Sequence, residues 1–212
     1  MVAWCRLKNI YVISDEIYAV SVNKTFYSLY KEADCVVWGL SKDVCASGMR
    51  CSVVYSKDKW LMENCLTLCM PYAVSGVAQV IFAQILEDNA FLDQFFESMR
   101  KDLNDARSDV MAKLDALQLP YVGKADFAGM FLWVDLSSVG GSDSIEIFSD
   151  LLENYKVFLT PGEPFFDRES GEALDVSRYG MGWMRICFAA SNAEARAEGL
   201  RRLERYVRDK RD

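Results

Sequence analysis

The chain contains no histidine, and its seven cysteines include no Cys-x-x-Cys pair. Cys65 and Cys69 are four positions apart, but no imidazole exists to complete a mixed zinc site with them. The odd number and scattered positions of the cysteines favour free thiols in a reducing compartment over a disulfide framework. We therefore expect neither a metal site nor a disulfide-stabilised secreted fold.

Long apolar runs and basic clusters are also missing. The segment from Met70 to Leu86 is the most apolar, but Ser75 and Gln79 interrupt it, and it falls short of a membrane span. Arg6 and Lys8 interrupt the N-terminal segment, which therefore does not resemble a signal peptide. The net charge of −7 argues against a nucleic-acid partner. These features predict a soluble, cytoplasmic protein with no membrane or nucleic-acid partner.

The composition is that of a globular protein, with 51% hydrophobic residues and no internal repeats or low-complexity segments. A length of 212 residues allows one large domain or two small ones. In the first part, apolar runs predict strands at Ile10–Ile13, Cys35–Leu40 and Ser52–Ser56. Their long connections favour parallel pairing through crossovers. Val2–Lys8 is expected to form a helix packed against the first strand.

Helical periodicity follows the third strand. Trp60–Leu68 and Ala73–Leu86 are predicted helices, and the second has a wide apolar face. Apolar residues from Phe96 to Leu117 predict one amphipathic helix of more than six turns. Because a helix of this length usually bridges two lobes, we expect a first domain at residues 1–92 and a second at residues 93–212.

The second domain is expected to be of the α+β class. Its predicted elements are a strand at Met130–Leu136, a helix at Ile145–Tyr155, strands at Val157–Thr160 and Met184–Ala189, and a final helix at Glu194–Arg208. Helix-capping residues precede both helices, at Asp143 and at Ser191-Asn192.

One stretch suggests a specific chemistry. The strand ending at Trp38 leads directly to Ser41 and Lys42, and Arg50 follows eight residues after the lysine. This arrangement suits a phosphate-bearing carbonyl cofactor, with the lysine as a Schiff-base former and the arginine as a phosphate ligand. A lysine near a strand end can equally be a solvated turn residue. Asp15 follows the first strand and has a similar alternative as a turn or capping residue.

Three motifs together resemble a known family. Ser14-Asp-Glu-Ile-Tyr-Ala19, Trp38-Gly-Leu-Ser-Lys-Asp43 and Gly182-Trp-Met-Arg-Ile-Cys-Phe-Ala189 resemble those of the class I/II pyridoxal-phosphate-dependent aminotransferases, in the same order. Within that family the chain looks most like the aminocyclopropane-carboxylate synthase-like branch. The resemblance implies an α/β fold: the C-terminal part of a fold type I large domain, followed by an α+β small domain. The family's N-terminal part has no counterpart here, so we expect a C-terminal portion with an uncovered sheet.

The resemblance also implies roles for individual residues. A buried Asp15 would keep the ring nitrogen of pyridoxal 5′-phosphate protonated, and Tyr18 would donate to the cofactor's O3′. Lys42 would form the Schiff base and shuttle the substrate's α-proton, aided by burial. Arg50 would contact the cofactor phosphate. Ser41 would add a hydroxyl to that phosphate, or is simply a hydroxyl at a strand end.

Arg185 lies within an apolar strand, where an unpaired charge costs several kcal/mol, so it needs an anion. The resemblance supplies the α-carboxylate of the substrate; a structural salt bridge is the alternative. Three positions depart from the family's pattern. Cys45 and Ser52 stand where relatives commonly carry glycine, and Gly39 stands where many carry a phosphate-binding serine. Added side chains there could crowd the phosphate.

The functions implied are those of a transaminase acting on an amino acid and a keto acid, or of an aminocyclopropane-carboxylate synthase-like lyase. A homodimer is expected for an intact form. A non-catalytic truncated fragment, or one half of a split protein, remains an alternative because the N-terminal half of the site is missing. A structural protein unrelated to the cofactor would have to contain three ordered motifs by chance.

Overall fold

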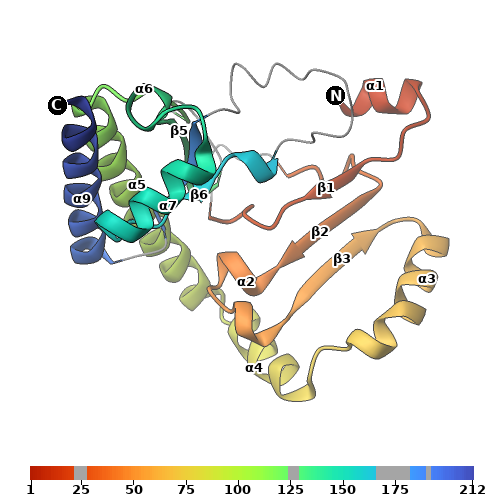
Figure 1. The fold of residues 1–212 in the computed structure, drawn as a ribbon. Coiled ribbons are helices and arrows are strands. Elements are labelled where there is room, and N and C mark those ends of the chain that lie inside the picture. Colours follow the sequence, from red (N-terminus) through yellow and green to blue (C-terminus); the bar gives the residue numbers. More distant parts are fainter. Residues whose placement is uncertain (22–27, 124–128, 166–181, 190–191) are drawn as a thin grey trace. The chain divides into compact units, whose positions relative to one another are not determined.

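The computed structural model describes residues 1–21, 28–123, 129–165, 182–189 and 192–212. These residues form two compact units, Met1–Arg100 and Lys101–Asp212, which are described separately below. The division falls inside the long helix α5 (Asn89–Ala116), whereas the sequence pattern placed it near the start of that helix. Figure 1 shows the order of the elements along the chain.

The first unit contains a three-stranded sheet in the order β1 (Ile13–Asp15), β2 (Cys35–Gly39), β3 (Ser52–Ser56). The expected parallel pairing is confirmed for β1 and β2, but it is wrong for β2 and β3, which are antiparallel. The intervening segment holds only the short helices α2 (Leu40–Asp43) and η1 (Ser47–Met49). Such a segment reverses the chain without providing the longer crossover that a parallel pair requires.

β1 begins three residues later than the predicted strand at Ile10–Ile13, because only the carbonyl of Val12, and not its N–H, takes part in the pairing with β2. Its N–H donates to the Asp34 carboxylate at 2.8 Å, and its carbonyl accepts from the N–H groups of Asp34 and Cys35. Strand pairing with β2 therefore starts at Ile13, opposite Cys35.

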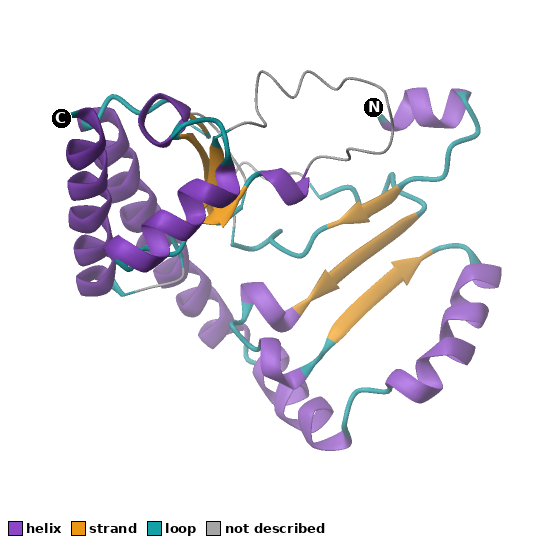
Figure 2. Ribbon diagram, in the orientation of Figure 1, coloured by secondary structure: helices purple, strands orange, loops and turns teal. Residues whose placement is uncertain are grey.

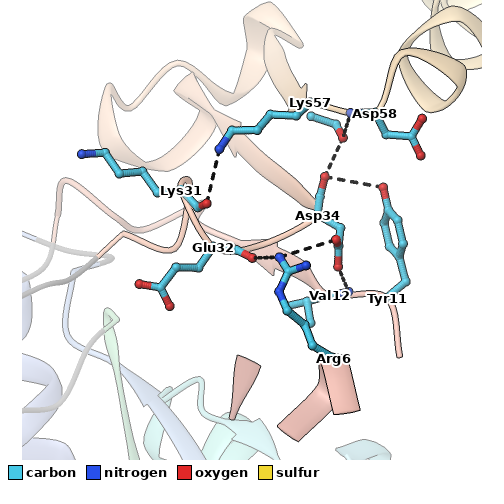
Figure 3. Close-up of polar contacts among 9 residues, drawn as sticks. Arg6, Tyr11, Val12, Lys31, Glu32, Asp34, Lys57 and Asp58 are labelled. Atoms are coloured by element: carbon cyan, nitrogen blue, oxygen red, sulfur yellow. Dashed lines mark hydrogen bonds and ion pairs between the residues drawn. The ribbon is translucent and has the colours of Figure 1, made fainter. Parts of the chain in front are cut away.

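Asp34 connects several segments at this end of the sheet (Figure 3). Its backbone carbonyl accepts hydrogen bonds from the hydroxyls of Ser56, at 2.5 Å, and of Tyr11, at 3.5 Å. Its carboxylate lies 3.8 Å from the guanidinium of Arg6, which also donates to the carbonyl of Glu32 at 2.6 Å. These contacts join the N-terminal segment to the start of β2 and the end of β3.

Along the chain, the strands of this sheet are preceded by the helix α1 (Val2–Leu7) and followed by the helices α3 (Lys59–Cys69), η2 (Met70–Tyr72) and α4 (Gly76–Glu87). The expectation that the first helix packs against the first strand is wrong. α1 buries no residue, and Leu7 is 83% exposed. α4 buries Ala78 and Phe82 against Leu40 of α2, which forms a small apolar core. This contact fixes α2, the turn that carries the candidate lysine.

The sheet of the first unit exposes apolar residues on both faces. Val53, Val54 and Tyr55 are consecutive in β3 and all exposed, as is Ile13 in β1. Successive residues of a strand point to opposite faces, so the described residues leave each face of β3 partly open. In the part of the chain that the structure describes, the uncovered sheet expected from the sequence is therefore found at β1 and β3, whereas Cys35 and Val36 of the central strand β2 are buried.

The second unit contains a four-stranded antiparallel sheet in the order β4-β5-β7-β6. Its elements after α5 are β4 (Tyr121–Val122), β5 (Phe131–Asp135), α6 (Ser137–Gly140), α7 (Ser144–Tyr155), β6 (Thr160–Pro161), η3 (Glu163–Phe165), β7 (Trp183–Cys187) and α9 (Ala193–Arg211). Helices α5, α7 and α9 pack with one face of the sheet around Leu114, Leu132, Leu151 and Tyr206. Figure 2 shows these helices in purple and the strands in orange.

The predicted elements of this unit are present, with small shifts. The strand expected at Val157–Thr160 is misplaced, because only Thr160 and Pro161 pair with β7. The N–H of Val157 instead bonds back to Leu151 at the end of α7. The predicted caps at Asp143 and Asn192 are confirmed, since each side chain accepts hydrogen bonds from the first turn of its helix. Ser191 lies outside the described residues.

Candidate active site

The sheet of the first unit brings three segments to one edge. The carboxyl ends of the parallel strands β1 and β2 lie at the same edge, and the amino end of the antiparallel β3 meets them there. Asp15 ends β1, Lys42 lies in the helical turn directly after β2, and Arg50 lies two residues before β3. The topology thus gathers candidate residues from positions far apart in the sequence.

The β1 side of this edge carries Asp15 and Tyr18. The Asp15 carboxylate accepts a hydrogen bond from the N–H of Ile17 at 3.1 Å, which is a turn-forming contact. Its side chain is exposed, so the expectation of a buried carboxylate is wrong for the described residues. Ile13, which shares a face of β1 with Asp15, is exposed as well, so this face of the strand is open among the described residues. Tyr18 is half-buried in the turn that follows.

The β2 side carries Ser41 and Lys42 on the short helix α2. Ser41 is half-buried, whereas Lys42 is exposed, contrary to the burial expected of it. Burial in α2 falls on the neighbouring Leu40 and Asp43, which are 1% and 0% exposed. The lysine amine therefore points away from the small core that holds its helix.

Asp43 is a functional candidate that the sequence did not single out. Its carboxylate accepts hydrogen bonds from the N–H groups of Val20, at 3.1 Å, and Ser21, at 2.9 Å, and from the hydroxyl of Ser21. The indole of Trp38 donates to it at 2.7 Å. Its place beside Lys42 in the motif was visible in the sequence, but its partners more than twenty residues away were not.

Arg50 and the positions that depart from the family pattern lie between β2 and β3. Arg50 has a left-handed backbone (φ 52°), and its guanidinium donates to the carbonyl of Ser47 at 3.0 Å. No carboxylate of the described residues forms an ion pair with it. Cys45 also has a positive φ of 55°, a conformation that glycine adopts without strain. This explains why glycine suits the position occupied by Cys45.

The other two departures lie directly opposite each other, because Gly39 of β2 pairs with Ser52 of β3. A Cβ atom added to Gly39 would lie 3.3 Å from the Cβ of Ser52 and 3.1 Å from Cδ1 of Ile17. Such distances are tight for carbon atoms, so the side chain of Ser52 favours a residue without a Cβ atom at position 39. The two departures thus compensate each other sterically.

Arg185 belongs to the second unit, where it lies on β7 opposite Trp133 of β5 and Thr160 of β6. Its guanidinium carbon lies 4.4 Å from the ring centre of Phe131 and 5.1 Å from that of Phe165. One guanidinium nitrogen donates to the Thr160 hydroxyl at 3.4 Å. Cation–π contacts of this kind stabilise a guanidinium without neutralising it.

The charge of Arg185 has no carboxylate counterion among the described residues. Its Nε atom is buried and has no hydrogen-bond partner there. The structural salt bridge considered as an alternative is therefore not found in the described part of the chain. An incoming anion would satisfy both the charge and the unpaired donor.

Other kinds of site find no support in the described residues. No cluster of acidic and cysteine side chains there could hold a metal ion, and all seven cysteines are free. Burial raises the pKa of the Cys35 thiol, and the nearby Cys65 adds to the effect. The described helices include none that combines the length and the apolar character needed to cross a membrane.

Comparison with known proteins identifies this arrangement. The family model for aminotransferase class I and II matches residues 1–203, almost the whole chain. The chain belongs to the class I and II aminotransferase family. The family assignment made from the three motifs is thereby confirmed.

Individual relatives agree on the branch. The chain is 28% identical over 223 residues to 1-aminocyclopropane-1-carboxylate synthase-like protein 1 of Takifugu rubripes, covering 99% of this chain and 34% of that protein. It is 26% identical over 219 residues to 1-aminocyclopropane-1-carboxylate synthase 8 of Arabidopsis thaliana, covering 94% of this chain and 44% of that protein. The chain thus spans between a third and a half of the length of these curated relatives.

Solved structures show the same fold. The aromatic aminotransferase of Pyrococcus horikoshii superposes with a TM-score of 0.82 at 22% identity, covering 99% of this chain and 54% of that one. The aspartate aminotransferase of Thermotoga maritima gives a TM-score of 0.78 at 22% identity, covering 98% and 50% respectively. The α/β fold of type I pyridoxal-phosphate-dependent transferases, predicted from the sequence, is confirmed.

Proposed function

We propose that this chain supplies the lysine, the phosphate-binding arginine and the substrate-binding arginine of a pyridoxal-phosphate-dependent aminotransferase acting on α-amino acids. The observation that carries the proposal is the meeting of Asp15, Lys42 and Arg50 at one edge of the β1-β2-β3 sheet. Family membership supplies the chemical context.

The residues present fit the cofactor. Lys42 is exposed and offers a primary amine to the carbonyl group, and Arg50 carries a guanidinium that no described carboxylate neutralises. Lys42 would hold the cofactor covalently, while Arg50 and the hydroxyl of Ser41 would bind its phosphate. When bound, pyridoxal phosphate supplies an electron sink for negative charge at the substrate's α-carbon.

The remaining residues would orient the reactants and move protons. The carboxylate of Asp15 would keep a proton on the ring nitrogen of the cofactor, and the phenol of Tyr18 would donate to O3′. The amine of Lys42 would take the proton from the α-carbon of the substrate and return it at a neighbouring atom. Arg185, with its unpaired Nε, would bind the α-carboxylate.

Two alternatives rest on specific observations. The names of relatives such as 1-aminocyclopropane-1-carboxylate synthase 8 favour a lyase, for which the same residues would serve the early steps. The coverage of only 34% of one relative favours a chain that acts together with further residues, or that has no activity of its own. A homodimer, together with amino-acid and keto-acid substrates, is proposed from the family.

Covalent labelling tests the proposal. The purified chain is mixed with pyridoxal phosphate, its visible absorption is recorded, and the product is reduced with borohydride and mapped by mass spectrometry. We expect one predominant label, on Lys42, that Lys42→Ala abolishes. Lys57→Ala is the matched control, because Lys57 follows the opposite end of β3. A label scattered over surface lysines, or equal loss in both variants, would contradict the proposal.

Turnover separates the two enzymatic versions. A transaminase consumes a keto acid in the presence of an amino acid, whereas the lyase consumes S-adenosylmethionine alone. A labelled Lys42 without either activity would support the non-catalytic alternative.

A further inference from the structure

We propose that Asp43 is a positioning residue that fixes Lys42 relative to the turn carrying Tyr18. The inference rests on the proposed function, because it concerns the residue expected to hold the cofactor. Asp43 directly follows Lys42 in α2, and it is completely buried although it carries a carboxylate.

Both carboxylate oxygens of Asp43 are occupied by donors from outside α2. Oδ1 accepts from the N–H of Ser21 at 2.9 Å and from the hydroxyl of the same residue. Oδ2 accepts from the N–H of Val20 at 3.1 Å and from the indole Nε1 of Trp38 at 2.7 Å. A carboxylate held by two donors on each oxygen has a fixed orientation, because any rotation breaks several bonds at once.

These bonds connect the two turns that carry the candidate site. Val20 and Ser21 follow the turn of Tyr18 after β1, whereas Asp43 ends the helical turn of Lys42 after β2. α2 has only four residues, Leu40–Asp43, and a helix this short has little stability of its own. Its position therefore depends on the anchors on either side of Lys42, which are the buried Leu40 and the bonded Asp43.

A carboxylate is needed at this position rather than an amide. All four contacts of Asp43 come from donors, so the NH₂ group of an asparagine would face at least one N–H or O–H without an acceptor. Asp43→Asn therefore changes the bonding while leaving size and shape nearly unchanged. It should release Val20 and Ser21 on one side and loosen the turn of Lys42 on the other.

Glu16 provides a matched control. It is 7% exposed, and its carboxylate accepts from the hydroxyl of Ser14 at 3.1 Å, the hydroxyl of Ser28 at 2.6 Å and the N–H of Leu29 at 2.8 Å. Like Asp43, it is a buried carboxylate bonded to a distant segment. Its side-chain bonds, however, lead to Ser14 and to residues 28–29 and not to α2, so Glu16→Gln should leave Lys42 in place.

The test measures two quantities in the wild-type chain, in Asp43→Asn and in Glu16→Gln. One is hydrogen–deuterium exchange of the amides in residues 17–21 and 40–46. The other is the share of pyridoxal-phosphate label that borohydride fixes on Lys42 rather than on other lysines. In Asp43→Asn we expect exchange in both segments to accelerate about tenfold or more, and the Lys42 share to fall about tenfold, as expected for a lost buried hydrogen bond. Glu16→Gln should change neither.

The outcomes separate this inference from the proposed function. Unchanged exchange and labelling in Asp43→Asn would overturn it, as would an equal loss in Glu16→Gln, which would indicate general loosening. If the wild-type chain takes no label on Lys42, the proposed function fails. The exchange data then decide alone: joint acceleration of both segments supports the link through Asp43, and exchange unchanged in either segment refutes it.

A milder variant covers the case in which Asp43→Asn does not fold. Trp38→Phe removes a single donor, the indole N–H, and keeps an aromatic ring at the position. We expect it to accelerate exchange in residues 40–46 and to lower the Lys42 share about two- to fivefold, less than the aspartate change. Wild-type values in both measurements for a folded Trp38→Phe would contradict the inference.

Discussion

Replacing Arg185 by methionine tests whether the guanidinium of Arg185 lacks a counterion in the folded chain. The buried Nε has no partner among the described residues, and such an unpaired donor costs about 1–3 kcal/mol. Against this, the rings of Phe131 and Phe165, at 4.4 Å and 5.1 Å, each stabilise the guanidinium by about 0.5–1 kcal/mol. Methionine is flexible enough to fill the same space between the rings.

The cost of the unpaired Nε and the stabilisation by the two aromatic rings nearly cancel, and the cost is slightly larger, so the variant should be slightly more stable than the wild type. We expect Arg185→Met to change the free energy of unfolding by between about −1 and +2 kcal/mol. If a compensating carboxylate were present, breaking the buried pair would instead cost about 3–5 kcal/mol. Urea unfolding followed by circular dichroism measures the difference. A loss of more than about 3 kcal/mol would refute the argument that Arg185 lacks a counterion.

Arg196→Met is the control, because Arg196 has a carboxylate partner among the described residues. Two guanidinium nitrogens of Arg196 bond the Asp109 carboxylate, at 3.1 Å and 2.8 Å, and the arginine side chain is 12% exposed. Asp109 is 57% exposed, so its charge is largely solvated and the pair is worth only about 0.5–1 kcal/mol. Arg196→Met should therefore destabilise the chain by about that amount.

A carboxylate ligand completes the experiment on Arg185. Acetate at ten times its dissociation constant would stabilise the folded chain by about 1.4 kcal/mol through mass action. We expect this rise in the wild type and in Arg196→Met, but not in Arg185→Met, with sodium chloride of equal ionic strength as the reference. An equal effect of acetate on all three proteins would show that Arg185 is not the anion site.

Three further predictions concern stability. Tyr206→Phe should raise the free energy of unfolding by about 1 kcal/mol near neutral pH, because the buried hydroxyl of Tyr206 has no hydrogen-bond partner in the described structure. Burial raises the pKa of Tyr206 to about 12, so the wild type should lose stability as the pH rises above 10, where the unfolded tyrosine ionises, and the phenylalanine variant should lose less. Hydrogen bonds from Lys210 and Asn154 lower the pKa of Asp150, so its contribution is present above its unfolded pKa and is lost as the pH falls through its folded pKa. As the pH is lowered, the free energy of unfolding should therefore fall less in Asp150→Asn than in the wild type. The difference should be less than about 1 kcal/mol, because the pair of Asp150 with Lys210 is partly exposed. Gly39→Ala should destabilise the chain by about 1 kcal/mol, and Ser52→Gly should recover part of this in the double mutant; purely additive effects in urea unfolding would contradict the steric coupling.

Local sequence patterns predicted most of the elements, because apolar periodicity directly reflects which face of a helix or strand is buried. The strand at Ser52–Ser56 and the caps at Asp143 and Asn192 are present as expected. The start of β1 was missed because Val12 bonds to Asp34, and no local pattern encodes a contact across that distance. The antiparallel direction of β3 was missed for a different reason, because the segment between β2 and β3 was interpreted as a crossover although it holds only the short helices α2 and η1.

The candidate site was predicted from motifs rather than from its environment. Motifs identify Asp15 and Lys42, but they say nothing about exposure, and both side chains are exposed where burial was expected. Conversely, Asp43 looked like an ordinary charged neighbour of Lys42. Its burial depends on donors from Val20, Ser21 and Trp38, which only the folded chain brings together.

The openness of β3 has a consequence for colloidal stability. Ser52–Ser56 is a short, uncharged segment of high β-propensity without proline, which is typical of sequences that nucleate aggregation. Arg50 and Lys57 flank it and act as charged gatekeepers. Because Arg50 is also the proposed phosphate ligand, removing its charge would promote aggregation whether or not a cofactor binds. Arg50→Lys keeps the gatekeeping charge but loses the planar fork, so it can separate the two roles of this residue.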